Sequence, residues 1–240
     1  FWEHLRRHSR NFDHVVCANH DLSRRLDEGG VRHTVTIPMG VEAGCFSPAL
    51  RDRSLRARLL ADCGLPESAA LLLAVGRLAP EKRWPMVIDA VGMASQQSPI
   101  GLVMLGEGRE QRTILRHIAG NPHVRLFAPE RDRAAFARIM ASADALVHGC
   151  EAETFCMTAA EARASGLPVV VPDAGGAADH ASGGAGRTYA AADCNAAAAA
   201  ILEVVRERPR PAVQARSMDE HFRELFAAYA LCREGGRRAA

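Results

Sequence analysis

The stretch ADALVHGCEAETFCMTAAEARASGLPVVVPD, residues 143–173, predicts the fold class of this chain. Residues 143–149 and 168–173 are short apolar runs bounded by polar or turn-forming residues, a pattern typical of buried strands. Residues 157–165, between them, are expected to form a helix. A strand, a helix and a second strand in succession indicate a βαβ unit, whose two strands run parallel.

The same alternation of strand and helix continues on both sides of this unit. Because parallel strands are buried on both faces, helices are expected on both sides of the sheet. We therefore predict an α/β fold with a doubly wound, Rossmann-like parallel sheet. The further strands are expected at residues 71–77, 101–108 and 124–129, and the further helices at 84–95, 109–119, 131–141 and 195–206.

The N-terminal part of the chain has a separate pattern. Residues 14–19 and 34–40 predict two strands, and the segment 21–30 between them predicts a helix that stops at glycine. Residues 41–56 then form a predicted linker. Because only the end of one doubly wound domain precedes this linker, and because the chain opens without methionine, we expect the sequence to be a fragment.

The C-terminal part begins with a predicted break at RPRPA, residues 208–212. Residues 218–232 follow as an amphipathic helix. Its apolar face is formed by Phe222, Leu225, Phe226 and Tyr229.

Composition excludes several classes of protein. The formal net charge of +2 is too small to indicate binding to nucleic acid. No apolar run approaches the roughly 20 residues that span a bilayer, and the charged opening residues 1–10 do not form a signal peptide. The seven cysteines are scattered and include no CxxC pair, which favours reduced thiols in a cytosolic protein over disulfides or a zinc site.

Two cations follow the first predicted strand of the main domain in the segment VGRLAPEKRW, residues 75–84. The strand ends at Gly76, so Arg77 and Lys82 emerge at the carboxyl edge of the sheet, where open α/β sheets bind ligands. A guanidinium fork and a compact ammonium together suit a diphosphate. Lys82 is the sole lysine in the chain. The alternative is a pair of solvated loop cations that contribute little to stability, and spacing alone does not separate the two.

A second set of candidate residues surrounds the predicted helix at 157–165. Glu153 precedes this helix and Glu161 lies on it, while the backbone amides of Cys156, Met157 and Thr158 lie at its N-terminus. Free amides and the helix dipole favour a phosphate there, and a carboxylate on the helix can accept both hydroxyls of a ribose. The alternatives are dipole complementation for Glu153 and a solvated helical face for Glu161.

The sequence predicts no metal site. It contains no acidic cluster near the phosphate loop, and no HxxxH pair lies near that loop, since the one such spacing, His4 and His8, is at the start of the chain. His148, at the end of an apolar strand, is expected to be structural. His180, which follows Gly175 and Gly176, is either structural or close to the sugar.

Four motifs together resemble the large retaining glycosyltransferase family, group 1 or family 4-like, that includes mannosyl- and glucosyltransferases and sucrose synthases. They are IPMGVEAGCFSP (37–48), VGRLAPEKRW (75–84), GEG (106–108) and ETFCMTAAEARASGLPVVVPDAGG (153–176). Cys156 stands where that family often has glycine, Met39 where asparagine is common, and Ala128 where glycine is common. These departures put the orientation of the base in doubt more than the type of reaction.

The resemblance implies two Rossmann-like domains, of which the C-terminal one holds the nucleotide sugar. It implies that Arg77 and Lys82 bind the diphosphate, Glu161 the ribose and Glu153 the transferred sugar. The other implied donor contacts are Gly76, Gly106, Phe127 within the base-binding segment 125–128, and the turn at Cys156, Met157 and Thr158. The implied division is 1–47 for the end of the acceptor domain and the linker, 48–215 for the donor domain, and 216–240 for a helix that packs back on the acceptor domain.

We therefore expect a retaining, metal-independent glycosyltransferase without a cofactor. It would move a hexose from a UDP- or GDP-sugar to the hydroxyl of a glycan, lipid or small molecule. The motifs ETFC (153–156) and DAGG (173–176) most resemble those of mannosyltransferases that use GDP-mannose. We expect it in the cytoplasm, with peripheral contact at the inner membrane face left open. The alternatives are a non-catalytic sugar-nucleotide-binding module and an epimerase. A dinucleotide-dependent oxidoreductase is disfavoured, since no GxGxxG follows a predicted strand.

Overall fold

The computed structural model describes residues 1–209 and 216–238, and within them the main domain is built on a six-stranded sheet of order β5-β4-β3-β6-β7-β8. All neighbouring strands are parallel, so the predicted α/β parallel fold is confirmed. The strands are β3 (Ala70–Val75), β4 (Ile100–Leu105), β5 (Val124–Phe127), β6 (Ala145–Val147), β7 (Val169–Pro172) and β8 (Gly186–Tyr189).

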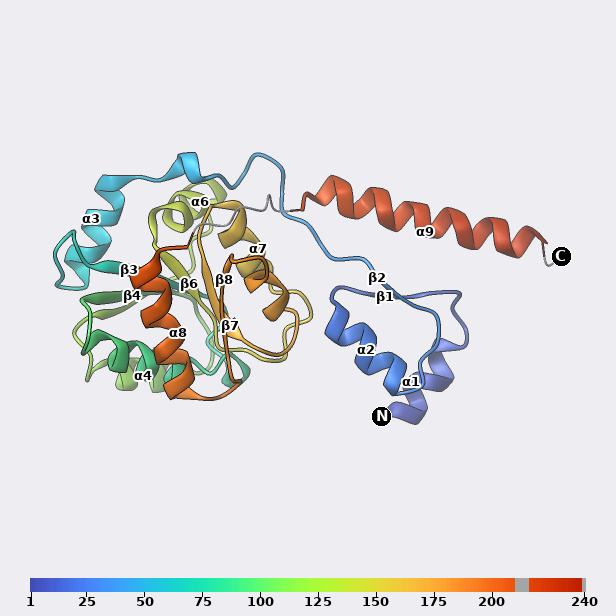
Figure 1. Cartoon of the computed structure of the whole chain (residues 1–240), viewed down its shortest axis with the longest axis horizontal. Coiled ribbons are helices and arrows are strands. Elements are labelled where there is room, and N and C mark those ends of the chain that lie inside the picture. Colours follow the sequence, from blue (N-terminus) through green and yellow to red (C-terminus); the bar gives the residue numbers. More distant parts are fainter. Residues whose placement is uncertain (210–215, 239–240) are drawn as a thin grey trace.

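Helices cover both faces of this sheet (Figure 1). Alternation along β3 divides the core, because Leu72 packs with one set of helices while Leu71 and Leu73 pack with the other. One face carries α4 (Trp84–Ser95), α5 (Gln111–Ile118) and α8 (Cys194–Glu207), and the other carries α3 (Arg53–Asp62), α6 (Arg133–Ser142) and α7 (Met157–Ala164).

The strand order creates a crevice at one edge of the sheet. Successive strands run outward from β3 toward β5 on one side and from β6 toward β8 on the other. The loops that follow β3 and β6 therefore leave in opposite directions, and the space between them is where doubly wound sheets bind ligands.

The structure differs from the prediction in the extent of several elements and in one additional strand. The strand expected at 101–108 ends at Leu105, because Gly106–Gly108 turns out of extended geometry, with φ +154° at Gly108. The predicted linker 41–56 is wrong at its end, since α3 begins at Arg53 after Asp52 caps the first turn. Strand β8 was not predicted at all, because its sequence GRTY lacks an apolar run.

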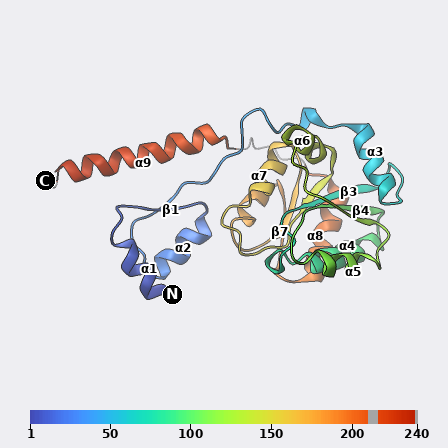
Figure 2. The ribbon, with the colours of Figure 1, turned by 180° about the vertical axis from the view of Figure 1, so that it is seen from behind.

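The N-terminal segment contains α1 (Trp2–Ser9), β1 (Val15–Cys17), α2 (His20–Glu28) and β2 (Thr34–Thr36), and its two strands pair in parallel. The long helix α9 (Met218–Arg238) begins beside Val41, which follows the N-terminal segment. Val41 N donates to Arg216 O and Met218 N donates to Val41 O, each at 2.9 Å. Figures 1 and 2 show α9 and the N-terminal segment on the same side of the main domain.

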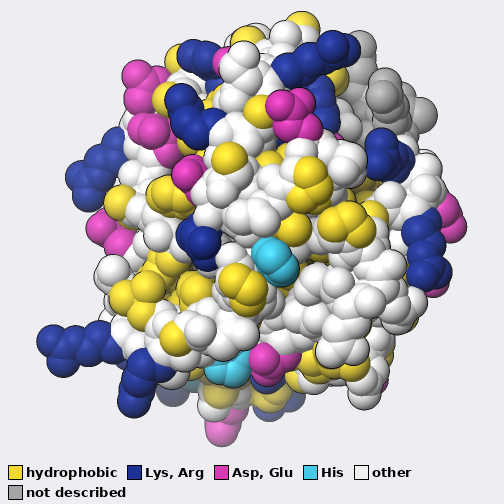
Figure 3. All heavy atoms as spheres, turned by 90° about the vertical axis from the view of Figure 1, so that its left-hand side faces the viewer, with side chains coloured by type: hydrophobic (Ala, Val, Ile, Leu, Met, Phe, Trp, Pro, Cys, Tyr) yellow, Lys and Arg dark blue, Asp and Glu magenta, His cyan; other side chains and the backbone are white. Residues whose placement is uncertain are grey.

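The predicted apolar face of α9 is solvent-exposed at Phe222, Phe226 and Tyr229. Within the described ranges, no helix combines the length and apolarity needed to cross a membrane. Residues 210–215 lie outside the described residues. The predicted domain end at 215 and most of the predicted break at 208–212 fall on them. On the face of the main domain turned away from α9, basic and acidic side chains are interspersed (Figure 3).

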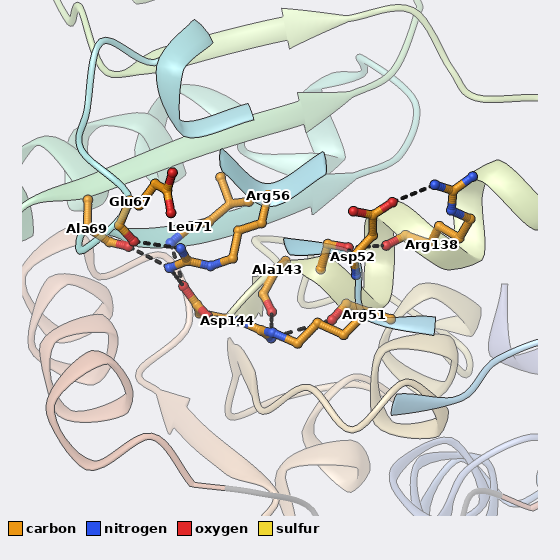
Figure 4. A network of polar contacts seen from close by, with 11 residues as sticks. Arg51, Asp52, Arg56, Glu67, Ala69, Leu71, Arg138, Ala143 and Asp144 are labelled. Carbon is orange, nitrogen blue, oxygen red and sulfur yellow. Dashed lines mark hydrogen bonds and ion pairs between the residues drawn. The ribbon is translucent and has the colours of Figure 1, made fainter. Parts of the chain in front are cut away.

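A polar network closes the opposite edge of the sheet, at the start of the strands (Figure 4). The Asp144 carboxylate accepts hydrogen bonds from Arg51 and Arg56, both at 2.7 Å, and from the backbone amide of Leu71 at 2.9 Å. Burial raises the pKa of Asp144, but these hydrogen bonds outweigh it and lower the pKa below its ordinary value. The network ties the loop before β6 to β3 and to the start of α3.

We expect Asp144→Asn to lower the free energy of unfolding by about 2 kcal/mol at neutral pH, the size typical of charged hydrogen bonds. Because the folded-state pKa lies below the unfolded one, the contribution is complete above the unfolded value near ~4 and is lost as the pH falls through the folded value. The free energies of unfolding of wild type and variant, measured with denaturant, should therefore converge in acid. The exposed Asp62→Asn is the control, and an equal loss there would contradict the assignment.

Candidate functional site

The loop after β3 lies over the carboxyl edge of the sheet and carries Arg77 and Lys82. Trp84, 1% exposed, holds this loop, since its indole Nε1 donates to Arg77 O at 2.8 Å. Gly149, just beyond β6, allows close approach: a Cβ there would lie 2.6 Å from Lys82 O. The structure thus places Lys82 in the crevice between β3 and β6.

Lys82 and Glu153 pair in this crevice. Lys82 Nζ donates to Glu153 Oε1, and both side chains are mostly buried, at 14% and 19% exposure. His148 Nε2 lies 3.1 Å from the same oxygen. His148 first and then Lys82 lower the pKa of Glu153, against the effect of burial, to about 2. Glu153 is therefore ionised, and Lys82 is not the solvated loop cation of the alternative interpretation.

His148 is the residue at this site that the sequence did not identify as functional. Burial lowers the pKa of its imidazole, but contacts with Cys150, Cys156 and Glu153 outweigh burial and raise the pKa well above its ordinary value. Its backbone is also fixed, because Tyr189 Oη donates to His148 O at 2.6 Å. A polar residue directly after an apolar strand was the available signal.

The backbone around Glu153 is held from two sides. Arg83 Nε donates to Glu151 Oε2 at 2.6 Å, which ties this segment to the loop after β3. Gly176 N donates to Glu153 O at 2.7 Å, which ties it to the loop after β7. The neighbouring Gly175 has φ +70°, and a Cβ there would lie 2.4 Å from Glu151 O. Loops after three strands therefore fix the position of the carboxylate.

Cys156 is the N-cap of α7 and adopts the left-handed conformation, with φ 70° and ψ 72°. A side chain in this conformation costs roughly 1 kcal/mol compared with glycine. Among the described residues, the backbone amides of Met157 and Thr158 have no acceptor, so they remain available to a ligand. His180 is structural, since it is buried and its Nε2 hydrogen-bonds with Phe155 O at 2.7 Å.

Glu161 is buried, with 5% of its surface exposed, so the interpretation of a solvated helical face is wrong. Its Oε1 accepts from Arg133 Nη1 at 2.8 Å, and that guanidinium lies 4.7 Å above the Phe46 ring. Burial raises the pKa of Glu161, and Arg133 opposes the rise. Nothing in the spacing of the sequence indicated Arg133 as a partner.

A cavity of about 370 Å³ adjoins this pair at the ends of β3, β4 and β5. Gly76, Gly106 and Arg133 line it. Gly106 lets the two strand ends approach, because a Cβ there would lie 2.2 Å from Gly76 O. Phe127 ends β5 and its carbonyl accepts from Gly106 N, but the cavity wall beyond β5 is formed by 129–131 instead.

The structure does not place the two predicted phosphate cations together. Arg77 extends into solvent, with 78% of its side chain exposed, and pairs with Glu81 at 3.0 Å. Lys82 turns instead toward Glu153. The residues that do meet around Lys82 come from loops far apart in the sequence.

Three side chains of this site also form a metal-ligating group that sequence spacing did not indicate. One donor atom each from His148, Glu153 and Cys156 lie within 4.8 Å of one another. A mixed set of imidazole, carboxylate and thiol spread over residues 148–156 matches neither an acidic cluster nor a histidine pair, so it was not predicted from the sequence.

Comparison with known proteins gives a family match and several relatives. The model of the family described as "Glycosyl transferases group 1" matches residues 56–221. A GDP-mannose-dependent alpha-mannosyltransferase of Mycolicibacterium smegmatis is 35% identical over 181 residues, covering 74% of this chain and 44% of that protein. A GDP-mannose-dependent alpha-(1-6)-phosphatidylinositol dimannoside mannosyltransferase of Mycobacterium tuberculosis is 32% identical, covering 69% and 42%. The chain thus spans less than half the length of these relatives.

Solved structures share the fold at low sequence identity. Anabaena Alr3699/HepE in complex with UDP and glucose superposes with a TM-score of 0.73 at 17% identity, covering 95% of this chain and 66% of that one. Sucrose-phosphate synthase from Thermosynechococcus elongatus gives a TM-score of 0.70 at 23% identity, covering 99% and 59%.

Proposed function

Because the chain belongs to the group 1 glycosyl transferases, we propose that it is the donor-binding half of a retaining glycosyltransferase that moves mannose from GDP-mannose to an acceptor hydroxyl. The observation that carries this proposal is the meeting of Lys82 and Glu153 in the crevice between β3 and β6. Residues 48–215 form the donor domain. Residues 1–47 are the end of the acceptor domain with its linker, and 216–240 contain the helix that returns to it.

The diphosphate binds between Lys82 and the N-terminus of α7. Lys82 supplies a point charge, and the free amides of Met157 and Thr158 supply hydrogen bonds. Arg77 reaches the same phosphates after it leaves Glu81, and an exposed pair of that kind contributes only ~0–1 kcal/mol. These groups stabilise the negative charge that grows on the diphosphate as the sugar departs.

The nucleoside occupies the cavity beside Glu161. The Glu161 carboxylate accepts from the ribose hydroxyls, and Arg133 holds that carboxylate in place. The base enters the 370 Å³ cavity near Gly76 and Gly106 and rests against residues 129–131, which follow β5. The similarity to two GDP-mannose-dependent mannosyltransferases supports guanine as the base and mannose as the sugar.

Glu153 contacts hydroxyls of the transferred sugar. Its pKa of about 2 keeps it an acceptor at every physiological pH. Its backbone is fixed by Gly176, so the carboxylate needs no rearrangement to meet the sugar. Front-face attack with retention of configuration follows from the family resemblance, and the acceptor is a glycan, lipid or small molecule.

A thermal-shift panel on the 240-residue chain tests the proposal, with GDP-mannose, UDP-glucose, ADP-glucose and NAD as ligands. A true ligand at about 100 times its dissociation constant adds about 2.7 kcal/mol of stability. We expect the largest shift with GDP-mannose. A shift with NAD alone would overturn the assignment. In a protein of the relatives' full length, product analysis separates transfer from epimerisation and from binding without turnover.

We expect EDTA to leave turnover of such a full-length enzyme unchanged. Lys82 and the α7 N-terminus supply the positive charge that a divalent ion supplies elsewhere. Initial rates with and without chelator check this. Loss of turnover that magnesium or manganese restores would contradict it.

A further inference from the structure

We propose that His148, Glu153 and Cys156 form a Zn²⁺ site whose occupation antagonises donor binding. Their donor atoms already lie within 4.8 Å of one another. Ligand atoms around a tetrahedral zinc are separated by about 3.5 Å, given bond lengths near 2.0–2.3 Å. Side-chain movement of about 1 Å therefore completes the geometry.

The chemistry of the three donors selects zinc over the hard divalent ions. An imidazole nitrogen, a carboxylate oxygen and a thiolate sulfur are the ligand types that zinc combines, whereas magnesium and calcium take oxygen ligands. Three protein ligands leave the fourth position open to water.

An unsatisfied buried group points into this set. His148 is 1% exposed, and its Nε2 has no hydrogen-bond partner within the described part of the chain, although it lies 3.1 Å from Glu153 Oε1. The geometry of that contact does not make a hydrogen bond, so a zinc ion bound at Nε2 gives this buried nitrogen a well-oriented partner. Trp84 packs edge-on against the imidazole with ring centres 6.3 Å apart, which fixes the ring from behind.

Cys156 provides a second, independent observation. It is buried and holds a left-handed conformation that favours glycine, yet its Sγ makes only one weak hydrogen bond among the described residues, with Thr158 Oγ1 at 3.6 Å. Strained residues with few stabilising contacts concentrate at functional sites. Here the strain places a thiol beside His148 and Glu153.

Zinc at this position opposes the donor, and this consequence rests on the proposed function. The ion takes up Glu153, the acceptor for the sugar hydroxyls, and repels the adjacent Lys82, the point charge for the diphosphate. The enzyme then requires no metal and is inhibited by one.

Cobalt substitution tests the site without any nucleotide. The 240-residue chain, reduced and metal-free, is titrated with Co²⁺, and thiolate-to-cobalt charge-transfer absorption is recorded. We expect one equivalent to bind, with zinc displacing it. Cys156→Ala should abolish the absorption and weaken zinc binding by more than about 100-fold, since even loss of a group behind a ligand costs about 10- to 100-fold.

Two further variants control the result. Cys156→Gly also removes the ligand but suits the left-handed backbone, so it should lose the absorption without loss of folding. Cys194→Ala removes a thiol on α8 that faces Met86 and should keep the absorption. Absence of the band in wild type, or its persistence in Cys156→Ala, would overturn the site.

Donor affinity measured in buffered zinc tests the antagonism. We expect zinc to weaken binding of GDP-mannose to wild type about tenfold or more, whereas the donor affinity of Cys156→Ala should be the same with and without zinc. Equal affinity with and without zinc would overturn the antagonism, whereas failure to bind the donor in the absence of zinc would count against the proposed function instead.

Discussion

Replacing Lys82 with alanine is expected to lower kcat/KM of the full-length enzyme by about 10²–10³, the size typical of deleting one preorganised electrostatic donor. Lys82 is placed for this role by the loop that Trp84 and Gly149 hold against the sheet edge. In the 240-residue chain the same change should weaken binding of GDP. Isothermal titration and steady-state kinetics measure the two effects.

A control variant and the stability of Lys82→Ala separate this role from folding. Lys82→Arg should restore charge but not activity, because a planar fork cannot replace a compact ammonium in a crevice that leaves only 14% of the side chain exposed. We expect Lys82→Ala also to lower the free energy of unfolding by about 1–3 kcal/mol, because it leaves a mostly buried carboxylate with one partner fewer. Wild-type kcat/KM in Lys82→Ala with saturating acceptor would contradict the diphosphate assignment.

Trp84→Ala is expected to lower the free energy of unfolding by about 3–5 kcal/mol, the range for truncating a buried large aromatic residue. Its ring is 1% exposed in the core between the sheet and α4, and its indole supports Arg77 O. Denaturant unfolding measures the loss. Met93→Ala on the same helix, with 39% of Met93 exposed, is the matched control and should cost under about 1 kcal/mol. Equal losses in both variants would contradict the buried role of Trp84.

Periodicity in the sequence was sufficient for most of the fold. The apolar runs of β3, β4 and β7 and the pattern of α4 are strong, because these elements are buried along most of their length. Strand β8 gave no such signal, because its GRTY sequence carries little apolar surface. It forms in the structure because it pairs with β7. The start of α3 was missed because its cap, Asp52, follows a run that reads as a loop.

In the candidate site, too, the sequence identified some of the residues and the tertiary structure decided the others. Residue type and position, together with the resemblance of residues 75–84 and 153–176 to the glycosyltransferase family, identified Lys82, Glu153 and Glu161 as candidates. Their partners were decided by the tertiary structure alone. The β6–β3 neighbour relation brings His148 to the Lys82–Glu153 pair, and the start of α6 brings Arg133 to Glu161. Local sequence determines which segments become strands and helices, but strand order is settled by how their apolar faces pack, and only that order sets which loops meet.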